Sequence, residues 1–467
     1  MAKSSKIKWS WLVGSRPYWM LVTFLLLTFV TGGGSRADIR SLVILRPAAV
    51  IFCGIGLWSL KWEHVKAYRF LFGMAAGIFA LVGSHLIPLP PALWETLPGR
   101  EIITEIDKLA ELGEIWRPIS MVPSATWNAL YSLFVPLAVL VLGVQLSREE
   151  RFKLLPVLLS LGLFSGFWGI LQVVGDARGP LYLYNITNNG EAVGLFSNRN
   201  HQAMLLASLF SMLAVYACSG VRSVEQANAR GYLALAAGAV LVPLLLVTGS
   251  RAGLAVGVIG AISIPFLYRK PTIIIPKKRD GKKTYLSWIF GGFAALCLGA
   301  LTLILSRAEA VHRLLTKDET DELRFQMWPY IADMAWKYFP VGSGVGSFVE
   351  AYQIDEPQIL LDTTYVNHAH NDWLELYMTT GIVGLIMLGL AVFAFGRSTL
   401  AAFNAPLADG RDISFARLGA TIIFILAVGS IGDYPLRAPS IACLFVIATL
   451  WLTGDSDRSA KNAGALR

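Results

Sequence analysis

Long apolar runs alternate with short polar segments along most of the chain. About twelve of these runs have roughly 17 residues or more, which is the length that a transmembrane helix needs. The pattern predicts an all-α polytopic membrane protein with about 12 transmembrane helices, built as a single membrane domain over residues 1–467. The predicted spans lie at residues 18–33, 41–60, 68–89, 127–146, 152–174, 200–219, 231–249, 252–268, 285–305, 373–396, 414–432 and 437–453.

The composition agrees with this class, since 55% of the residues are hydrophobic and 15% are charged. A soluble domain has about 25% charged residues. The net charge is +9, and in another context a basic chain of this kind would suggest nucleic acid as a partner. Here the basic residues lie in short loops between apolar runs, which is typical of membrane orientation, so no nucleic acid is predicted as a partner.

The distribution of Lys and Arg predicts which side each loop faces. With the N-terminus in the cytoplasm, 25 of the 40 basic residues fall on the cytoplasmic side, as the positive-inside rule requires. The segment 269–284 carries seven of them, and we expect it to be a cytoplasmic loop that lies against anionic lipid. The chain is therefore predicted to be multi-pass with both termini in the cytoplasm.

Two long loops fall on the opposite side, at residues 90–126 and 306–372. The first contains Ile102–Leu112, a candidate for a short amphipathic helix. The second is the largest polar piece, and helical spacing of apolar residues predicts a helix over 321–339 that packs against the bundle. A glycine-rich turn at 342–346 is expected to end that helix.

Polar and titratable residues gather on the side of the two long loops. Such groups at the ends of membrane helices are costly, so they favour a functional interpretation. The stretch 366–375 holds His368 and His370 directly before a predicted span. The other members are Asn198, Arg199 and His201 before the sixth span, Ser250 and Arg251 between the seventh and eighth, Arg324 and Trp328 in the large loop, and Asp433, Tyr434 and Arg437 between the last two.

Each of these residues also has a structural interpretation. Arg199 would serve as an interfacial residue that extends its charge into water, and Asp433 and Arg437 would pair with each other across their turn. His370 and His368 would be buried histidines with satisfied hydrogen bonds. Arg251 is harder to explain in this way, because it lies in a tight break within a long apolar stretch and a charge there needs a partner.

The residue types indicate transfer from a diphosphate. The forked donors of several arginines match diphosphate oxygens and would stabilise the charge of the leaving group. A histidine of near-neutral pKa can take the proton from an incoming hydroxyl. No metal site is predicted, because the spacing of His368 and His370 fits neither a helical ligand pair nor a zinc motif.

The pair His370–Asn371 is followed, after nine residues, by Gly381 and Gly384. This pattern resembles a signature of the O-antigen ligase/polymerase superfamily of bacterial membrane glycosyltransferases. The segments 194–201 and 250–253 are also similar to that family, as is the run from Arg324 through Trp328 and Pro340 to Gly346. The resemblance covers roughly residues 190–450.

The resemblance implies a GT-C-like fold and a metal-independent, inverting transfer without a cofactor. The donor would be a glycan on undecaprenyl diphosphate, the acceptor a hydroxyl of a lipid or glycan, and the reaction would face the periplasm from the bacterial inner membrane. By position, His370 matches the residue that activates the acceptor, Arg251 a residue that contacts the donor diphosphate, and Arg199 a second one. We add further substrate-binding candidates from the residues themselves: Arg324, Asn198, His368, Asn371, Asp433 and Arg437.

The subfamily stays open at this point. A ligase would join the glycan to lipid A–core, a polymerase would join it to a second lipid-linked repeat in O-antigen or exopolysaccharide synthesis, and a protein O-oligosaccharyltransferase would use a protein side chain. His368 and the turn at 433–437 lie outside the signature. A flippase or transporter for a lipid-linked glycan is the alternative class, but the chain shows no internal repeat and its polar residues lie at span ends.

Overall fold

The computed structural model describes the chain apart from residues 1–13, 222, 271–318, 362–364, 406–410 and 455–467. Within this part the structure is helical, except for connecting segments and one antiparallel pairing of β1 (Pro88–Leu89) with β2 (Arg117–Pro118). The α-helices are α1 (Arg16–Thr31), α2 (Leu42–Ser59), α3 (Trp62–Ala67), α4 (Arg69–Ser84), α5 (Pro91–Trp94), α6 (Glu101–Leu109), α7 (Pro123–Ser132), α8 (Phe134–Gly143), α9 (Arg148–Val174), α10 (Arg199–Cys218), α11 (Val224–Val247), α12 (Arg251–Leu267), α15 (Glu319–Lys337), α16 (Phe348–Ile354), α17 (Asp372–Asn404), α18 (Arg411–Gly432) and α19 (Pro439–Thr453). Two 3-10 turns are η2 (Gln358–Leu360) and η4 (Pro435–Arg437).

The predicted spans match the helices of the structure. Among the described residues, seven helices are long and apolar enough to cross a membrane, and four shorter apolar helices accompany them. Each coincides with one predicted span, although α11 begins earlier and α17 ends later because polar residues extend both helices. The predicted span at 285–305 and most of the loop at 269–284 lie outside the described residues. The chain is thus an all-α polytopic membrane protein, as predicted.

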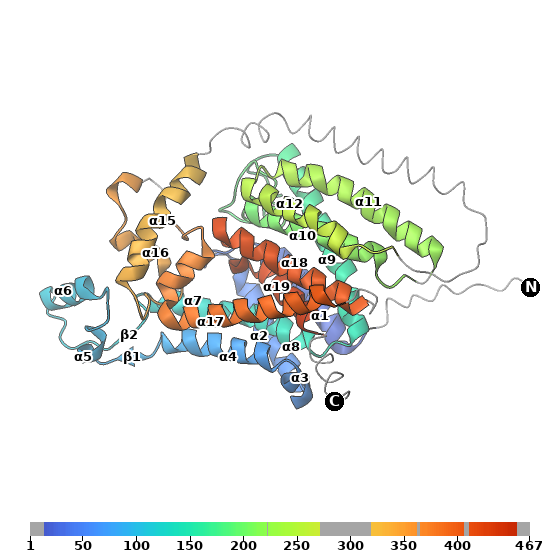
Figure 1. Ribbon diagram of the computed structural model, residues 1–467. Coiled ribbons are helices and arrows are strands. Elements are labelled where there is room, and N and C mark those ends of the chain that lie inside the picture. The colour runs from blue at the N-terminus through green and yellow to red at the C-terminus, as the bar shows by residue number, and fades with distance from the viewer. Residues whose placement is uncertain (1–13, 222, 271–318, 362–364, 406–410, 455–467) are drawn as a thin grey trace, which may run out of the picture.

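Helix α10 is the central element of the bundle (Figure 1). Of its span, 89% is buried inside the protein, compared with 33% for α11. It packs against α9, α11, α12 and α18, and inside this core the hydroxyls of Ser211 and Ser263 hydrogen-bond at 2.8 Å. Because α10 is enclosed, the polar residues at its N-terminus are also enclosed by neighbouring helix ends.

Helices α15 and α16 lie beyond one end of the bundle (Figure 1). Met327, Ile331, Met334 and Tyr338 are buried there in a small apolar cluster. The described part of the 321–339 stripe therefore packs as predicted, with Met327, Ile331 and Met334 in α15 and Tyr338 directly after it. The cluster also contains Met378 of α17, so the polar loop is packed firmly onto the helix that follows it.

The glycine-rich turn after α15 fits into a break in α17. Gly381 has φ +58° and ψ −148°, a conformation that only glycine adopts readily. The break frees the carbonyls of Met378 and Thr379, which accept hydrogen bonds from the backbone N–H groups of Ser343 and Gly344, each at 3.0 Å. A Cβ on Gly381 would lie 2.1 Å from the Pro340 carbonyl oxygen, so the close approach depends on glycine.

The loop at 90–126 also contacts the glycine-rich turn at 342–346. Its amphipathic segment forms α6, close to the predicted 102–112. Arg100, at the start of α6, is fully buried and donates hydrogen bonds to the carbonyls of Pro98, Ile119 and Gly342 at 2.7–2.8 Å. Burial lowers the pKa of Arg100 to about 10, so the side chain stays charged at neutral pH. The two long loops therefore form one supported unit over the helix ends.

Candidate active site

Polar residues from several helix ends meet where the long loops cover the bundle. Ser250 caps α12 and donates from Oγ to Asn200 Oδ1 at 2.7 Å. The amide of Asn200, in the first turn of α10, donates in turn to Asp433 Oδ2 at 2.6 Å. Asp433 directly follows α18. One chain of hydrogen bonds thus joins the ends of α10, α12 and α18.

Asp433 is the most enclosed acid of this group, with a side chain that is 0% exposed. Its Oδ2 accepts from Asn198 Nδ2 at 3.2 Å as well as from Asn200. Its Oδ1 accepts from the backbone N–H of Tyr434 at 2.9 Å. A carboxylate with several donors keeps its charge despite burial. The predicted pairing of Asp433 with Arg437 is wrong, since Asp433 points into the helix junction instead.

His370 faces this carboxylate. Its Nδ1 lies 3.5 Å from Asp433 Oδ1, and its side chain is 12% exposed. The backbone of His370 has φ +49°, which is uncommon for a residue with a side chain and marks sites where the surrounding structure imposes the conformation. Asn371 follows and caps α17, its Oδ1 accepting from the N–H of Leu374 at 3.1 Å. The turn between these two residues aims the imidazole at Asp433.

Tyr434 packs against three histidines. Its ring centroid lies 4.4 Å from that of His368, 4.9 Å from that of His370 and 5.3 Å from that of His201. Its hydroxyl accepts a hydrogen bond from Asn367 Nδ2 at 3.2 Å. The ring therefore fixes the stretch around residue 368 to the turn after α18, and it separates the environments of His368 and His370.

His368 has its own acid. Its Nδ1 lies 3.2 Å from Glu375 Oε1, and the side chain of Glu375 is 1% exposed. Arg437 contacts the same Oε1 at 3.0 Å and Asp372 Oδ1 at 2.9 Å. The other oxygen of Glu375 accepts from the N–H of Ala369 at 3.0 Å. Arg437 thus bridges two acids in the first turn of α17, and one of them, Glu375, holds the loop that carries the histidines.

Three arginines predicted to bind the substrate come from different elements. Arg199 pairs with Glu191 at 3.2 Å, with both side chains largely buried. Arg251 begins α12, and the turn before it lies against that pair, because a Cβ on Gly249 would be 3.7 Å from Glu191 Oε2 and 3.9 Å from Arg199 Nη1. Arg324 of α15 exerts its charge on His370, Asp433 and Tyr434. The structure therefore places positive charge from three elements around the helix junction.

The protonation of the site follows from burial and from the paired acid. Burial lowers the pKa of His370, while the interaction with Asp433 opposes this shift only in part. Burial alone would raise the pKa of Asp433, but His370 and His201 outweigh it and hold that pKa well below its usual range. Burial, together with Asp433, raises the pKa of Tyr434 to about 12. At neutral pH the pair is therefore a neutral imidazole and a carboxylate.

The spacing of the His370–Asn371 motif has a structural reason. Asn371 caps α17, and Gly381 breaks the same helix nearly three turns later, at about 3.6 residues per turn. The turn that docks in this break belongs to the loop that covers the histidines. The distance between cap and break therefore sets how far the covering loop sits above His370.

Glu191 was not singled out from the sequence. Asn200, His201 and Glu375 lie in the polar segments that the sequence singles out, but no role in the site was predicted for them. His201 Nε2 lies 3.9 Å from Asp433 Oδ1 with no exposed side-chain surface. The signal for Asn200 and His201 was present, since they directly follow Asn198 and Arg199 at the start of a span. Asn198 and Asn371 both cap helices, so their amides are engaged with protein groups.

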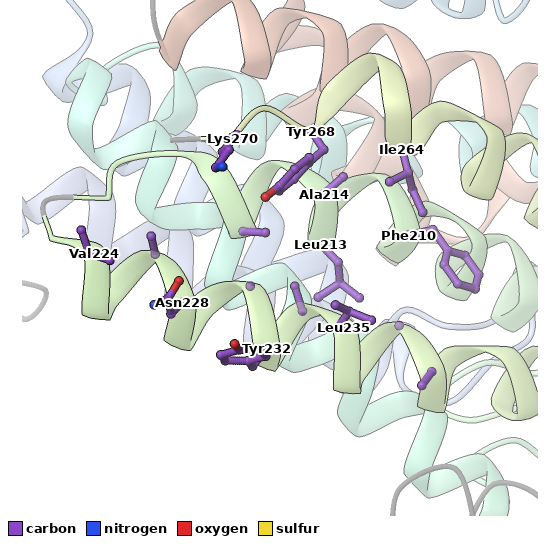
Figure 2. Close-up of a pocket in the computed structure, with 16 residues that line it drawn as sticks. Phe210, Leu213, Ala214, Val224, Asn228, Tyr232, Leu235, Ile264, Tyr268 and Lys270 are labelled. Atoms are coloured by element: carbon purple, nitrogen blue, oxygen red, sulfur yellow. The ribbon is translucent and has the colours of Figure 1, made fainter. Parts of the chain in front are cut away.

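Two larger cavities differ in their relation to this site. One, of about 660 Å³, is lined by His368, Asn367 and Arg437 among others. The second, of about 820 Å³, lies between α11 on one side and α10 and Ile264 on the other, as Figure 2 shows. Its nearest lining residue on α10 is Phe210, which lies about 14 Å further along the helix than His201 at 1.5 Å per residue. The larger cavity is therefore remote from the histidines.

Among the described residues, no three His, Cys, Asp or Glu side chains are grouped so that they could hold a metal ion. The carboxylates near the histidines are instead engaged with amides, arginine and backbone N–H groups.

Comparison with known proteins supports the family that the motifs predict. A family model described as O-Antigen ligase matches residues 231–389. The matched part begins in α11, ends in α17 and includes Arg251, Arg324 and His370. No curated protein matches the chain. The match supports membership of the O-antigen ligase/polymerase superfamily and a glycosyltransferase-like role in polysaccharide biosynthesis.

Proposed function

Since residues 231–389 match an O-antigen ligase domain, we propose that this protein transfers a glycan from undecaprenyl diphosphate to an acceptor hydroxyl in the biosynthesis of cell-surface polysaccharide. The observation that carries the proposal is the buried pair of His370 and Asp433, 3.5 Å apart, beside arginines from three elements. A base for a hydroxyl and a cationic site for a diphosphate are the two parts that such a transfer needs.

His370 is the base in this proposal. A carboxylate beside Nδ1 favours the tautomer that carries its proton there, which leaves the lone pair on Nε2 to accept a proton. Burial keeps the imidazole neutral at pH 7. Asp433 stabilises the imidazolium that forms when the acceptor hydroxyl gives up its proton.

The bond changes balance in a single displacement. The acceptor oxygen bonds to the anomeric carbon as its proton passes to His370. The bond from that carbon to the diphosphate oxygen breaks, and undecaprenyl diphosphate leaves with the electron pair. Attack opposite the leaving group inverts the anomeric centre. Arg251, with Arg199 and Arg324, stabilises the charge on the departing diphosphate, so we propose that the transfer needs no metal ion.

The proposal includes the orientation of the protein in the membrane. With both termini in the cytoplasm of a bacterium, the end of the bundle that carries His370 faces the periplasm from the inner membrane. The loops at 90–126 and 306–372 are then periplasmic, and the loop at 269–284 is cytoplasmic. A lipid-linked donor would enter from the bilayer and present its diphosphate at the level of the helix ends, where Arg251 begins α12.

The test is reconstitution of the whole protein in vesicles with an undecaprenyl-diphosphate-linked glycan and an acceptor. We expect release of undecaprenyl diphosphate by the natural protein, and its loss in His370→Ala and in Arg251→Ala. Matched controls are His64→Ala on α3 and Arg178→Ala, which is exposed in the loop after α9. Normal release by either site variant would refute the mechanism, and movement of unchanged donor across the membrane would indicate a transporter.

A further inference from the structure

His201 is a second imidazole beside the Asp433 carboxylate, and the proposed transfer gives it no role. It lies in the first turn of α10 and is fully buried. Its Nε2 lies 3.9 Å from Asp433 Oδ1, the same oxygen that His370 Nδ1 approaches at 3.5 Å. Two histidines from different elements therefore face one oxygen atom, since His201 belongs to α10 and His370 precedes α17.

The two oxygens of Asp433 have different kinds of partner. Oδ2 accepts from the amides of Asn198 and Asn200 at 3.2 and 2.6 Å, which anchor that side of the carboxylate. Oδ1 faces both imidazoles, and neither lies within the roughly 2.7–3.2 Å of a normal N–H···O hydrogen bond. A small rotation of the carboxylate about the anchored Oδ2 would bring either imidazole into full contact. Oδ1 is thus shared between His370 and His201.

Aromatic rings hold the His201 imidazole in this place. The ring centroid of Phe196 lies 6.4 Å away and that of Tyr434 5.3 Å away, and both rings stand nearly perpendicular to the imidazole. Within the described part of the chain, neither nitrogen of His201 has a hydrogen-bond partner. A buried polar group is costly unless it interacts with another group, and packing between two rings would be served equally well by an apolar residue. The interaction with Asp433 is therefore what accounts for a histidine here.

The charges around His201 come from three other elements. The charged or titratable groups that act on it are Asp433 after α18, Arg324 of α15, and His368 and His370 before α17. Arg324 also acts on Asp433 and His370, so its charge does not distinguish the two imidazoles that face Oδ1. Tyr434 stays neutral, because its pKa is raised to about 12. What remains between His201 and His370 is their competition for one carboxylate oxygen.

We propose that His201 is a positioning residue, which shares Asp433 Oδ1 with His370 and so limits how strongly the carboxylate holds a proton on the base. An N–H of His201 directed at Oδ1 stabilises the carboxylate. A carboxylate that is already stabilised attracts the imidazolium of His370 less, so His370 stays neutral and able to accept the hydroxyl proton. The inference rests on the proposed function and adds a residue that controls its base.

The experiment measures the dependence of kcat/KM on pH in the reconstituted protein. His201→Phe fits an apolar ring between Phe196 and Tyr434 but has no N–H, whereas His201→Gln carries an amide N–H. Without the N–H, Asp433 attracts the imidazolium more strongly, so the pKa of His370 rises. We expect the acidic limb of the profile to move upward by about 0.5–1 pH unit in His201→Phe, and to stay close to its natural position in His201→Gln.

Two further variants complete the series. His201→Leu, a smaller apolar residue, should move the limb in the same direction as His201→Phe. His85→Phe is the matched control, because His85 is also buried but accepts from the N–H of Val345 at 3.2 Å in the covering loops. It should leave the limb in place. Thermal unfolding in detergent shows that each variant compared is folded.

A second measurement reads the same quantity without turnover. In the detergent-solubilised protein with isotope-labelled histidine, the NMR signal of His370, assigned by its loss in His370→Gln, should titrate at higher pH in His201→Phe than in the natural protein. An unmoved midpoint and limb in His201→Phe, or an equal shift in His201→Gln, would show that His201 only fills space, while the transfer itself stands. A shifted midpoint in a protein that releases no undecaprenyl diphosphate would retain the shared carboxylate and reject the proposed function.

Discussion

His370 and Asp433 form a buried imidazole–carboxylate pair, with Nδ1 3.5 Å from Oδ1, although one precedes α17 and the other follows α18. We expect Asp433→Asn to lower the transfer rate by about 10²- to 10⁴-fold, because the imidazolium formed during proton transfer loses its counter-charge. The asparagine keeps one oxygen for the Asn200 amide, so the helix junction should stay folded. Release of undecaprenyl diphosphate measures the effect, and a rate within a few-fold of the natural one would show that Asp433 is only structural.

The dependence of kcat/KM on pH should report the same pair. Burial lowers the pKa of His370 from its ordinary value of 6.5, so the base remains deprotonated at neutral pH and activity should fall only as pH drops below that value. Asp433 opposes the shift by favouring the imidazolium. Removing this charge in Asp433→Asn should therefore move the acidic limb of the profile to still lower pH. A limb that moves upward would mean that another group titrates.

The break in α17 provides a prediction about stability. In Gly381→Ala the new Cβ would meet the Pro340 carbonyl oxygen at 2.1 Å, and the backbone would keep φ +58°. We expect a loss of about 1–3 kcal/mol in the free energy of unfolding, with reduced activity. Gly389→Ala in the same helix is the matched control, because nothing lies within 4 Å of its added Cβ. Thermal unfolding in detergent should separate the two, and equal melting temperatures would contradict the docking of the glycine-rich turn.

The cap of α12 tests the hydrogen-bond chain into the site. Ser250 Oγ accepts from the N–H of Gly253 at 2.8 Å and donates to Asn200 at 2.7 Å. Ser250→Ala should cost about 0.5–2 kcal/mol as a lost cap and should also lower the transfer rate, since Asn200 then holds Asp433 less firmly. Ser223→Ala removes an equivalent cap from α11 and should affect stability alone. The two variants are compared at equal folded fraction, and identical activities would remove Ser250 from the site.

Arg100 allows a prediction about the covering loops. Arg100→Met keeps much of the volume but leaves the carbonyls of Pro98, Ile119 and Gly342 without this donor. Buried acceptors without partners cost about 1–3 kcal/mol. We expect a lower melting temperature and faster proteolysis of the loop at 90–126, measured on the detergent-solubilised protein. A variant as stable as the natural protein would show that water replaces the guanidinium.

The sequence predicted the helices well, because an apolar run of sufficient length has few alternatives to a membrane helix. It also placed the polar residues at the same ends of their spans. It could not tell which of them pair. Asp433 and Arg437 are four residues apart and of opposite charge, so pairing across their turn was one interpretation beside a role in substrate binding. In the structure the turn directs Asp433 to Asn200 and Arg437 to Asp372, and this depends on how four helices pack together.

The sequence also could not predict the contacts of residues whose role depends on how the helices pack. From the sequence, Glu191 in the loop before α10 would be an ordinary exposed acid, yet it pairs with Arg199 and is largely buried. Glu375 would be a polar residue at the start of a span, yet its carboxylate contacts the His368 imidazole. The motif includes Gly381, but the sequence does not show why a glycine is needed there. The need arises from the 342–346 turn, which packs into the break in α17.

The docking of the 342–346 turn into the break at Gly381 limits how this protein can be recombined with its relatives. A chimaera that exchanges the loop from α15 to His370 and joins it at the start of α17 would separate the turn from its receptor. The junction would instead have to fall after Ile382, whose N–H donates to the Pro340 carbonyl at 2.8 Å. The covering loop and the first part of α17 therefore have to be exchanged together if the exchanged protein is to fold.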